Sequence, residues 1–278
     1  MAANRILEPQ WQSGKLLPAL AELGHDITYL TTAQRWYAVA RPFLCVGAYA
    51  VFASMGWWIP AILAVAAYTF VSYGSTSHDL VHGNLGLPRG VNRMLLSIIE
   101  LLGLRSGHAY RAAHLRHHRR FPHDDDVEAT AAHDTLCGAL LAGPMHQLRV
   151  WWWAMRTSRR DRTWIVCEGI ACIVLLVGAI AMVPVTPIPL VYVVFVVLGS
   201  WTFPLLTSYL PHLPNGVDAL HQTRRFRGKV AGFIFQQHYY HLEHHLYPKV
   251  PYRHWPTLAA RLDPYLDQAG ITAIHFGF

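Results

Sequence analysis

Two long stretches of this sequence are almost free of charged residues. The first, Phe43 to His78, contains no Asp, Glu, Lys or Arg, and the second, Thr163 to Val217, contains only Glu168. A single helix needs about 20 apolar residues to cross a bilayer, so each stretch is longer than one span requires. Turn-forming residues interrupt them at Met55–Pro60 and at Val183–Pro189. Each stretch therefore predicts a hairpin of two membrane-spanning helices.

The composition agrees with a membrane protein. Of the 278 residues, 53% are hydrophobic and 14% are charged, whereas a soluble domain carries about 25% charged residues. We predict an all-α integral membrane fold that forms one domain over residues 1–278, with spans at about 41–57, 59–76, 164–183 and 189–209. A soluble helical bundle with very hydrophobic core helices is the alternative.

The positive charges indicate an orientation. Every Lys and Arg lies in the N-terminal, middle or C-terminal segment, outside both hairpin tips. The positive-inside rule places these three segments, and with them both termini, on the cytosolic side. We expect a cytosolic helical cap there, and the net charge of +7 favours contact with anionic headgroups. No nucleic-acid-binding motif is present, so we expect no nucleic-acid partner.

Three clusters of histidines fall in these predicted cytosolic segments. Their spacing of three or four residues places side chains on one face of a helical turn, and neutral imidazole is a good ligand for transition metals. Eight histidines exceed the four protein ligands of a zinc site, so they indicate two metals. The clusters are His78 and His82; His114, His117 and His118; and His241, His244 and His245.

These clusters, their order and their placement around two hairpins resemble the membrane fatty acid desaturase superfamily, which includes carotenoid hydroxylases and ketolases. The most specific segment is His238-Tyr-Tyr-His241-Leu-Glu-His244-His245-Leu-Tyr-Pro-Lys-Val-Pro. The resemblance covers about Phe43 to Leu262. It implies a di-iron centre of two Fe ions, held by the histidines, with O2 as co-substrate.

The resemblance also suggests a ninth ligand, His212. Tyr209-Leu210-Pro211-His212 ends the last predicted span, where acyl-CoA desaturases carry an additional histidine, and a Leu-Pro-His element resembles the carotenoid-modifying members in particular. The acyl-CoA enzymes have an Asn four residues before this histidine, which holds a water on the metal. Ser208 stands there in this chain, so the water-mediated contact is not expected to be the same.

Carboxylates near the clusters are candidates for supporting the ligands. A metal-bound histidine usually donates its second N–H to a carboxylate or carbonyl. We predict this role for Asp79, Glu243 and the acidic run Asp124–Asp126 with Glu128, centred on Asp125, and we place His238 near the site as well. Solvated surface charges are the alternative interpretation of the acidic run.

The reaction predicted from the resemblance is O2-dependent desaturation or hydroxylation of C–H bonds in a long-chain membrane lipid. The di-metal centre itself is the catalytic group, and no separate catalytic side chain is assigned. Our first hypothesis is a fatty-acyl lipid desaturase, and the second is a carotenoid (β-carotene) hydroxylase or ketolase. A histidine-rich metal transporter or sensor is a remote third, because a transport pathway needs ionisable residues within the spans and only Glu168 qualifies.

Such a reaction needs electrons from outside the chain. The sequence has no G-x-G-x-x-G fingerprint for a flavin or nicotinamide and no His-Pro-Gly-Gly of a fused cytochrome b5 domain. We therefore expect a separate electron donor, either ferredoxin or cytochrome b5 with its reductase. Basic residues would attract such an acidic carrier or anionic lipid. They are Arg111, Arg116, Arg119, Arg120, Arg224, Arg225, Arg227 and Lys229.

Overall fold

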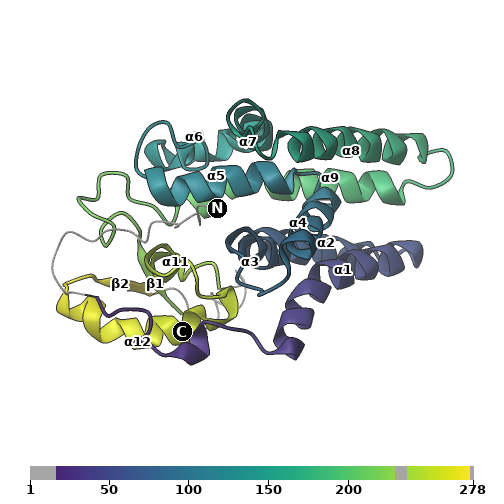
Figure 1. Ribbon diagram of the computed structural model, residues 1–278. Coiled ribbons are helices and arrows are strands. Elements are labelled where there is room, and N and C mark those ends of the chain that lie inside the picture. Colours follow the sequence, from purple (N-terminus) through teal and green to yellow (C-terminus); the bar gives the residue numbers. More distant parts are fainter. Residues whose placement is uncertain (1–16, 229–236, 276–278) are drawn as a thin grey trace.

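The computed structural model describes residues 17–228 and 237–275, which are mostly helical (Figure 1). The two hairpins have their tips at one end, and the C-terminal elements lie at the other. The helices are η1 (His25–Ile27), α1 (Thr32–Ser54), α2 (Trp58–Val71), η2 (Ser72–Thr76), α3 (Ser77–His82), α4 (Arg89–Leu102), α5 (Gly107–Arg120), η3 (Thr130–His133), α6 (Leu136–Leu141), α7 (Gly143–Thr157), α8 (Arg162–Ala181), α9 (Ile188–Ser200), η4 (Pro204–Tyr209), α11 (His241–Leu246), η5 (Tyr252–His254) and α12 (Trp255–Gln268).

Four helical segments are long and apolar enough to cross a membrane: His25–Ser54, Trp58–His82, Arg162–Ala181 and Ile188–Tyr209. The four predicted spans are thus present. Two bounds differ from the prediction. The first helix begins well before residue 41, because Thr31 and Gln34 form a reciprocal cap at the start of α1. The second continues past residue 76 into the first histidine cluster, because no helix-breaking residue intervenes.

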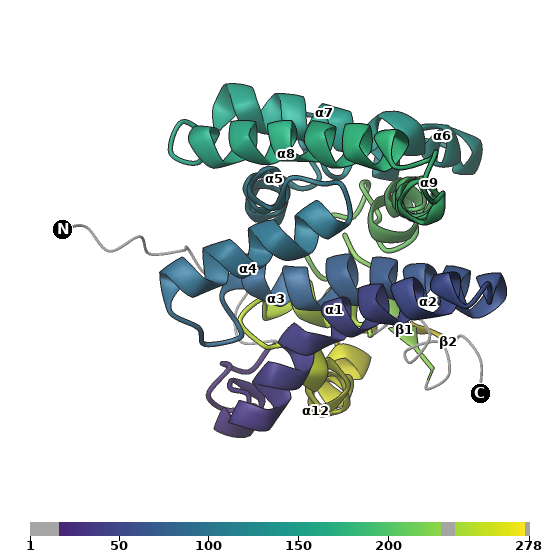
Figure 2. The same ribbon diagram turned by 90° about the vertical axis from the view of Figure 1, so that its right-hand side faces the viewer.

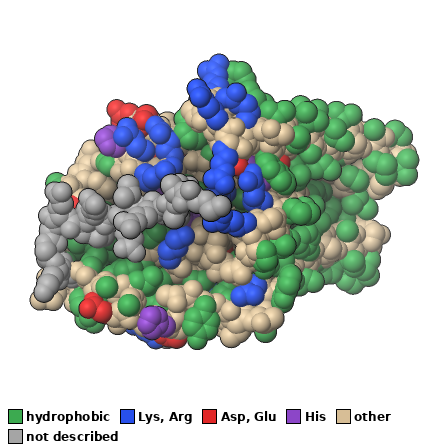
Figure 3. All heavy atoms as spheres, in the orientation of Figure 1, with side chains coloured by type: hydrophobic (Ala, Val, Ile, Leu, Met, Phe, Trp, Pro, Cys, Tyr) green, Lys and Arg blue, Asp and Glu red, His purple; other side chains and the backbone are tan. Residues whose placement is uncertain are grey.

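The outer faces of these helices are apolar. On α8, large side chains such as Ile170, Ile173, Val177 and Ile180 are more than half exposed. Figure 3 shows hydrophobic side chains covering the end of the molecule that holds the hairpin tips, while Lys and Arg gather nearer the middle of this face. An apolar surface of this extent fits contact with lipid and would aggregate in water.

Both hairpins end in a π-helical turn. The turn η2 continues α2, and η4 continues α9. Pro204 has no N–H, so the α-helical hydrogen bond to Ser200 cannot form, and a wider turn accommodates it. Single π-helical turns inside longer helices frequently occur at functional sites. Here the two turns form opposite walls of a cavity described below.

Helices pack in layers around the ends of the spans. In both views α7 and α8 lie on one side of the molecule, α12 on the other, and α4, α5 and α2 between them (Figure 2). The largest core cluster joins α12 to α3 and α4 through Trp255, Leu258, Leu80 and Leu96, all fully buried. At Gly143 a Cβ atom would lie 2.2 Å from the carbonyl oxygen of Trp201, so only glycine permits this approach of α7.

A two-stranded parallel sheet joins β1 (Arg225–Arg227) to β2 (Ala273–His275), with Phe226 opposite Ile274. The all-α prediction missed this sheet, since three-residue strands leave too little periodicity to detect. Arg225 is buried and pairs with Asp263 at 2.7 Å and with Asp267 at 2.6 Å.

The sheet also changes the predicted basic docking surface. Arg225 and the largely buried Arg227 are engaged in ion pairs inside the protein, so the prediction that they attract a carrier at the surface was wrong. Lys229, the last member of that predicted surface, lies outside the described residues.

Candidate metal centre

The structure brings all nine predicted histidines together in two adjacent groups. Within each group, one nitrogen from every ring lies within 4.8 Å of the others. The rings of His118 and His245, one from each group, have centroids 4.5 Å apart. The first histidine group is His78, His82, His114, His118 and His244. The second histidine group is His117, His212, His241 and His245.

Helical geometry divides the H-x-x-H-H clusters between the groups. On α5, His114 and His118 are four residues apart and share a face directed at the first group, while His117 points to the second. On α11 the pair four apart, His241 and His245, belongs to the second group, and His244 belongs to the first. The cluster on α5 therefore gives two histidines to the first group and one to the second, and the cluster on α11 gives one to the first and two to the second.

The second group has the spacing of a metal site. The Nε2 atoms of His117 and His212 are 3.1 Å apart, those of His212 and His241 3.2 Å, and those of His241 and His245 3.1 Å. A point equidistant from nitrogens spaced in this way lies about 2 Å from each, which is the length of a metal–imidazole bond. In the first group, His118 Nε2 lies 3.1 Å from His114 Nε2 and 2.8 Å from His244 Nε2.

Hydrogen bonds at the other ring nitrogen decide where the imidazole protons sit. His212 Nδ1 lies 2.9 Å from the carbonyl oxygen of Ser208, which only accepts, so Nδ1 carries the proton. His117 Nδ1 lies 2.7 Å from Asp126 Oδ2, and His114 Nδ1 lies 3.0 Å from Glu128 Oε1. A neutral ring protonated at Nδ1 presents a lone pair at Nε2. Lone pairs facing each other at about 3 Å repel unless a cation lies between them, so the donor set fits a metal.

Burial favours the neutral, ligating form of most of these rings. It lowers the pKa of His118, His241, His244 and His245 well below the usual range, and neighbouring imidazoles lower it further. Burial would also lower the pKa of His117, but the hydrogen bond and charge of Asp126 raise it overall. Asp126 thus contributes negative charge next to the second group.

The predicted supporting residues are placed differently from one another. Asp125, the centre of the predicted acidic run, is half exposed and pairs with Arg116 and Arg120 instead of a histidine. Its neighbours Asp126 and Glu128 are buried and bond the ligands. Within the predicted acidic run, the role therefore falls to Asp126 and Glu128, and the choice of Asp125 was wrong, because the turn after α5 directs Asp126 inward.

Asp79 and Glu243 support loops in place of imidazoles. Asp79 Oδ1 accepts the N–H of Tyr252 at 3.0 Å, and Glu243 pairs with Arg227 at 2.6 Å. Both carboxylates are fully buried. Among the described residues neither bonds to a histidine ring, so these contacts hold α3 and α11 in position and act on the ligands only through the helices.

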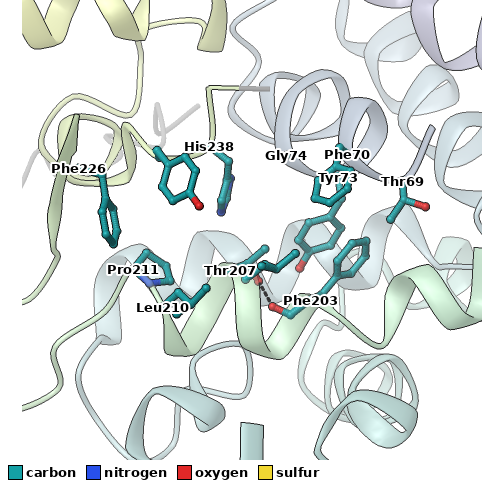
Figure 4. A pocket seen from close by; sticks show the side chains of 12 residues that line it. Thr69, Phe70, Tyr73, Gly74, Phe203, Thr207, Leu210, Pro211, Phe226 and His238 are labelled. Carbon is teal, nitrogen blue, oxygen red and sulfur yellow. Dashed lines mark hydrogen bonds between the residues drawn. The ribbon is translucent and has the colours of Figure 1, made fainter. Parts of the chain in front are cut away.

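A narrow cavity, partly open to its surroundings, lies beside the second histidine group (Figure 4). The turns η2 and η4 face each other across it, and His238 lines it with its ring centroid 4.9 Å from that of His241. Apart from a few polar groups the walls are apolar. The lining residues are Thr69, Phe70, Tyr73, Gly74, Phe203, Leu206, Thr207, Leu210, Pro211, Phe226, His238 and Tyr239.

Tyr73 is a site residue that the sequence did not indicate. Its ring stacks on Tyr110 and Phe203, with centroids 4.3 Å and 4.0 Å away, and its hydroxyl donates to Glu128 at 3.3 Å. One tyrosine in an apolar span carries no distinctive pattern. Only the fold shows that it connects the cavity to the carboxylate that bonds His114.

Four apolar helices that support two buried histidine groups beside an apolar cavity define an integral membrane protein with a site suited to metal-dependent oxidation. Residues 55–277 match the family model described as fatty acid desaturase, so the chain belongs to that family. No curated protein matches the chain. Membership implies an oxidoreductase that acts on lipid, in a family that generally uses iron and O2 and usually an electron donor.

Proposed function

We propose that this protein uses O2 to oxidise a C–H bond of a long-chain membrane lipid at a di-iron centre held by the nine histidines. One observation carries the proposal: the apolar cavity reaches the second histidine group, where His238 and His241 have ring centroids 4.9 Å apart. A lipid chain in the cavity would then lie next to the metals.

In this proposal each histidine group holds one iron. The bound metals would supply the reduction of O2 and the oxidising power for the C–H bond. Asp126, Glu128 and the Ser208 carbonyl keep His117, His114 and His212 protonated at Nδ1 and aimed through Nε2. Because these rings are already oriented, they need not turn before they bind the metals.

The cavity walls would orient the lipid. The Tyr73 and Phe203 rings, stacked at 4.0 Å, form one rigid wall, and Arg105 lies 5.0 Å from the centroid of Phe203. Rigid walls restrict which carbon lies beside the metals, and displacement by about an ångström is costly in such reactions. The side chains of the cavity therefore select the position that is oxidised.

We retain a fatty-acyl lipid as the first substrate hypothesis, with desaturation as the outcome. A carotenoid hydroxylase or ketolase is the second candidate, favoured by the Leu210-Pro211-His212 element. Leu210 and Pro211 line the cavity and His212 belongs to the second group, so this element would contact substrate and metal together.

The electrons would come from a separate carrier, either ferredoxin or cytochrome b5 with its reductase. We propose that the end holding the histidines faces the cytosol, as the positive-inside rule indicates. Arg119 and Arg120 are exposed at the end of α5 there. With Arg225 and Arg227 internal, these two are the better candidates for steering an acidic carrier.

Expression in cells that make β-carotene tests the function, with pigments and fatty acids analysed together. New double bonds in acyl chains without oxygenated pigment support the desaturase and exclude the carotenoid enzyme. Oxygenated pigment with unchanged acyl chains supports the carotenoid enzyme and excludes the desaturase. The His244→Ala variant is the control. No product of either kind in cells that supply a working reductase system would contradict the proposal.

A further inference from the structure

The cavity contains few polar groups, and three of the hydroxyls that line it have partners within the protein. The Thr69 hydroxyl donates to the Val65 carbonyl at 3.1 Å, and the Thr207 hydroxyl donates to the Phe203 carbonyl at 2.9 Å. The Tyr73 hydroxyl donates to Glu128. These groups satisfy themselves within the protein, so a hydrocarbon chain can pass them without loss of hydrogen bonds.

His238 differs from these residues. Its Nδ1 and Nε2 atoms are both buried, and neither has a hydrogen-bond partner among the described residues. Figure 4 shows the ring reaching into the cavity between Tyr73 and Phe226, toward the wall formed by Leu210 and Pro211. Buried polar atoms of native proteins nearly always have a hydrogen-bond partner. Two ring nitrogens without one in a binding cavity therefore indicate a polar group on the ligand.

The backbone of Gly74 lies close to this ring. A Cβ atom at Gly74 would lie 3.6 Å from His238 Nδ1 and 3.7 Å from its Cβ, in ordinary van der Waals contact. The π-helical turn η2 therefore supports the ring closely. On its other side the ring lies near His241, with centroids 4.9 Å apart. A group bound to His238 thus sits at the end of the cavity nearest the second histidine group.

The chemistry of the ring limits what it recognises. Both ring nitrogens are buried in a cavity whose described walls contain no carboxylate, and such surroundings favour the uncharged imidazole. A neutral imidazole offers one N–H donor and one acceptor nitrogen. This matches a hydroxyl or a carbonyl oxygen, whereas a carboxylate or phosphate would need a cation that the described cavity walls do not provide.

We propose that His238 hydrogen-bonds a hydroxyl or carbonyl oxygen carried by the lipid, beside the carbon that the centre oxidises. His238 is then a specificity-determining residue, and the preferred ligand of the cavity is an oxygenated lipid in place of a plain hydrocarbon. The inference rests on the proposed function in that the cavity must bind lipid. It does not depend on turnover.

Equilibrium binding to the full-length protein in bilayer nanodiscs tests this directly. The probes are hexadecane, palmityl alcohol and methyl palmitate, which share one chain length and differ in the oxygen. We expect the wild type to bind the alcohol or the ester about tenfold more tightly than the hydrocarbon. Preference for one of the two oxygenated probes identifies a hydroxyl or a carbonyl as the group recognised.

Three variants separate hydrogen bonding from packing. His238→Leu should lose the preference while binding hexadecane as before, and His238→Gln should retain most of it. Thr157→Val removes a hydroxyl on α7 that bonds the Trp153 carbonyl away from the cavity, and should change nothing. Equal affinity for all probes, or an undiminished preference in His238→Leu, would overturn the inference.

Metal analysis of the same variants distinguishes a second role for this residue. His238→Leu should keep the metal content of the wild type. Loss of metal from it would make His238 a further ligand and overturn the inference. If instead the binding preference holds but no lipid is ever oxidised, the proposed function fails and the recognition by His238 stands.

Discussion

Tyr73 and Glu128 connect the wall of the apolar cavity to the first histidine group. The tyrosine hydroxyl lies 3.3 Å from Glu128 Oε1, and the same oxygen lies 3.0 Å from His114 Nδ1. A side chain that lines the cavity therefore reaches a candidate metal ligand through one carboxylate. Contact at the cavity wall and the orientation of His114 are physically linked.

The Tyr73→Phe variant removes this link while keeping the stacked ring. We expect a stability loss of about 1 kcal/mol, as for one hydrogen bond, together with a few-fold loss of metal affinity, smaller than the roughly 10- to 100-fold effect of removing a supporting carboxylate. Tyr68→Phe is the matched control, because its hydroxyl donates to the Ile99 carbonyl away from the site. Chelator competition measures the affinity. Equal metal affinity in both variants would refute the link.

The acidic run offers a comparison of neighbouring residues. Asp126→Ala should weaken metal binding by about 10- to 100-fold, because His117 loses the partner that fixes its tautomer. Asp125→Ala should leave metal binding unchanged, since Asp125 pairs only with arginines among the described residues. Metal retention during dialysis against a chelator measures both. A stronger effect at Asp125 would show that the turn after α5 has a different arrangement in the membrane.

The two groups predict a metal count. The purified wild type should hold two metal ions per chain, because nine imidazoles exceed what one ion coordinates. His244→Ala removes a member of the first group and His245→Ala a member of the second. Each variant should retain about one ion with high affinity and lose lipid oxidation, while still inserting into membranes. Elemental analysis decides, and a single ion in active wild-type protein would contradict the arrangement.

Stability of the metal-free protein should depend on pH. Burial holds the pKa of His118, His241, His244 and His245 well below the value of about 6.5 expected in the unfolded chain. Between these values the unfolded state binds more protons, so these four rings make stability fall as the pH falls below about 6.5. The raised pKa of His117 acts in the opposite direction and lowers stability as the pH rises through it. Thermal unfolding of the apo-protein from pH 8 to pH 5 measures this. In His244→Leu the unfolding temperature should decline less steeply with falling pH. A slope equal to that of the wild type would contradict the contribution of His244.

The ion pair of Arg105 with Glu100 should be important for folding. It is almost completely buried, with a nitrogen–oxygen distance of 2.6 Å. Removing one partner leaves a buried charge unpaired, so Arg105→Met should cost about 3–5 kcal/mol. Arg119→Met, at an exposed site, should cost little. Unfolding in detergent compares the two, and similar stabilities would mean that water reaches Glu100.

Much of the arrangement could be predicted from local patterns. The spans follow from charge-free length, and the ends of α9 with η4 agree with the predicted span to within a residue. The spacing of the histidines on α5 and α11 indicates that they can bind metal. The small sheet, the choice of Asp126 over Asp125 within the acidic run, and the contribution of Tyr73 could not be predicted in this way. Each depends on contacts between segments far apart in the chain, such as Tyr73 with Glu128.

The sequence by itself therefore determined the number of spans and the residues able to bind metal, because both depend on composition and on spacing within one helix. The tertiary structure alone decided that His117 joins His212, His241 and His245 while His114 and His118 join His244. That division depends on how α5 and α11, which are far apart in the sequence, are placed relative to each other. It also placed His238 in the cavity, where its ring lies near both Gly74 and His241.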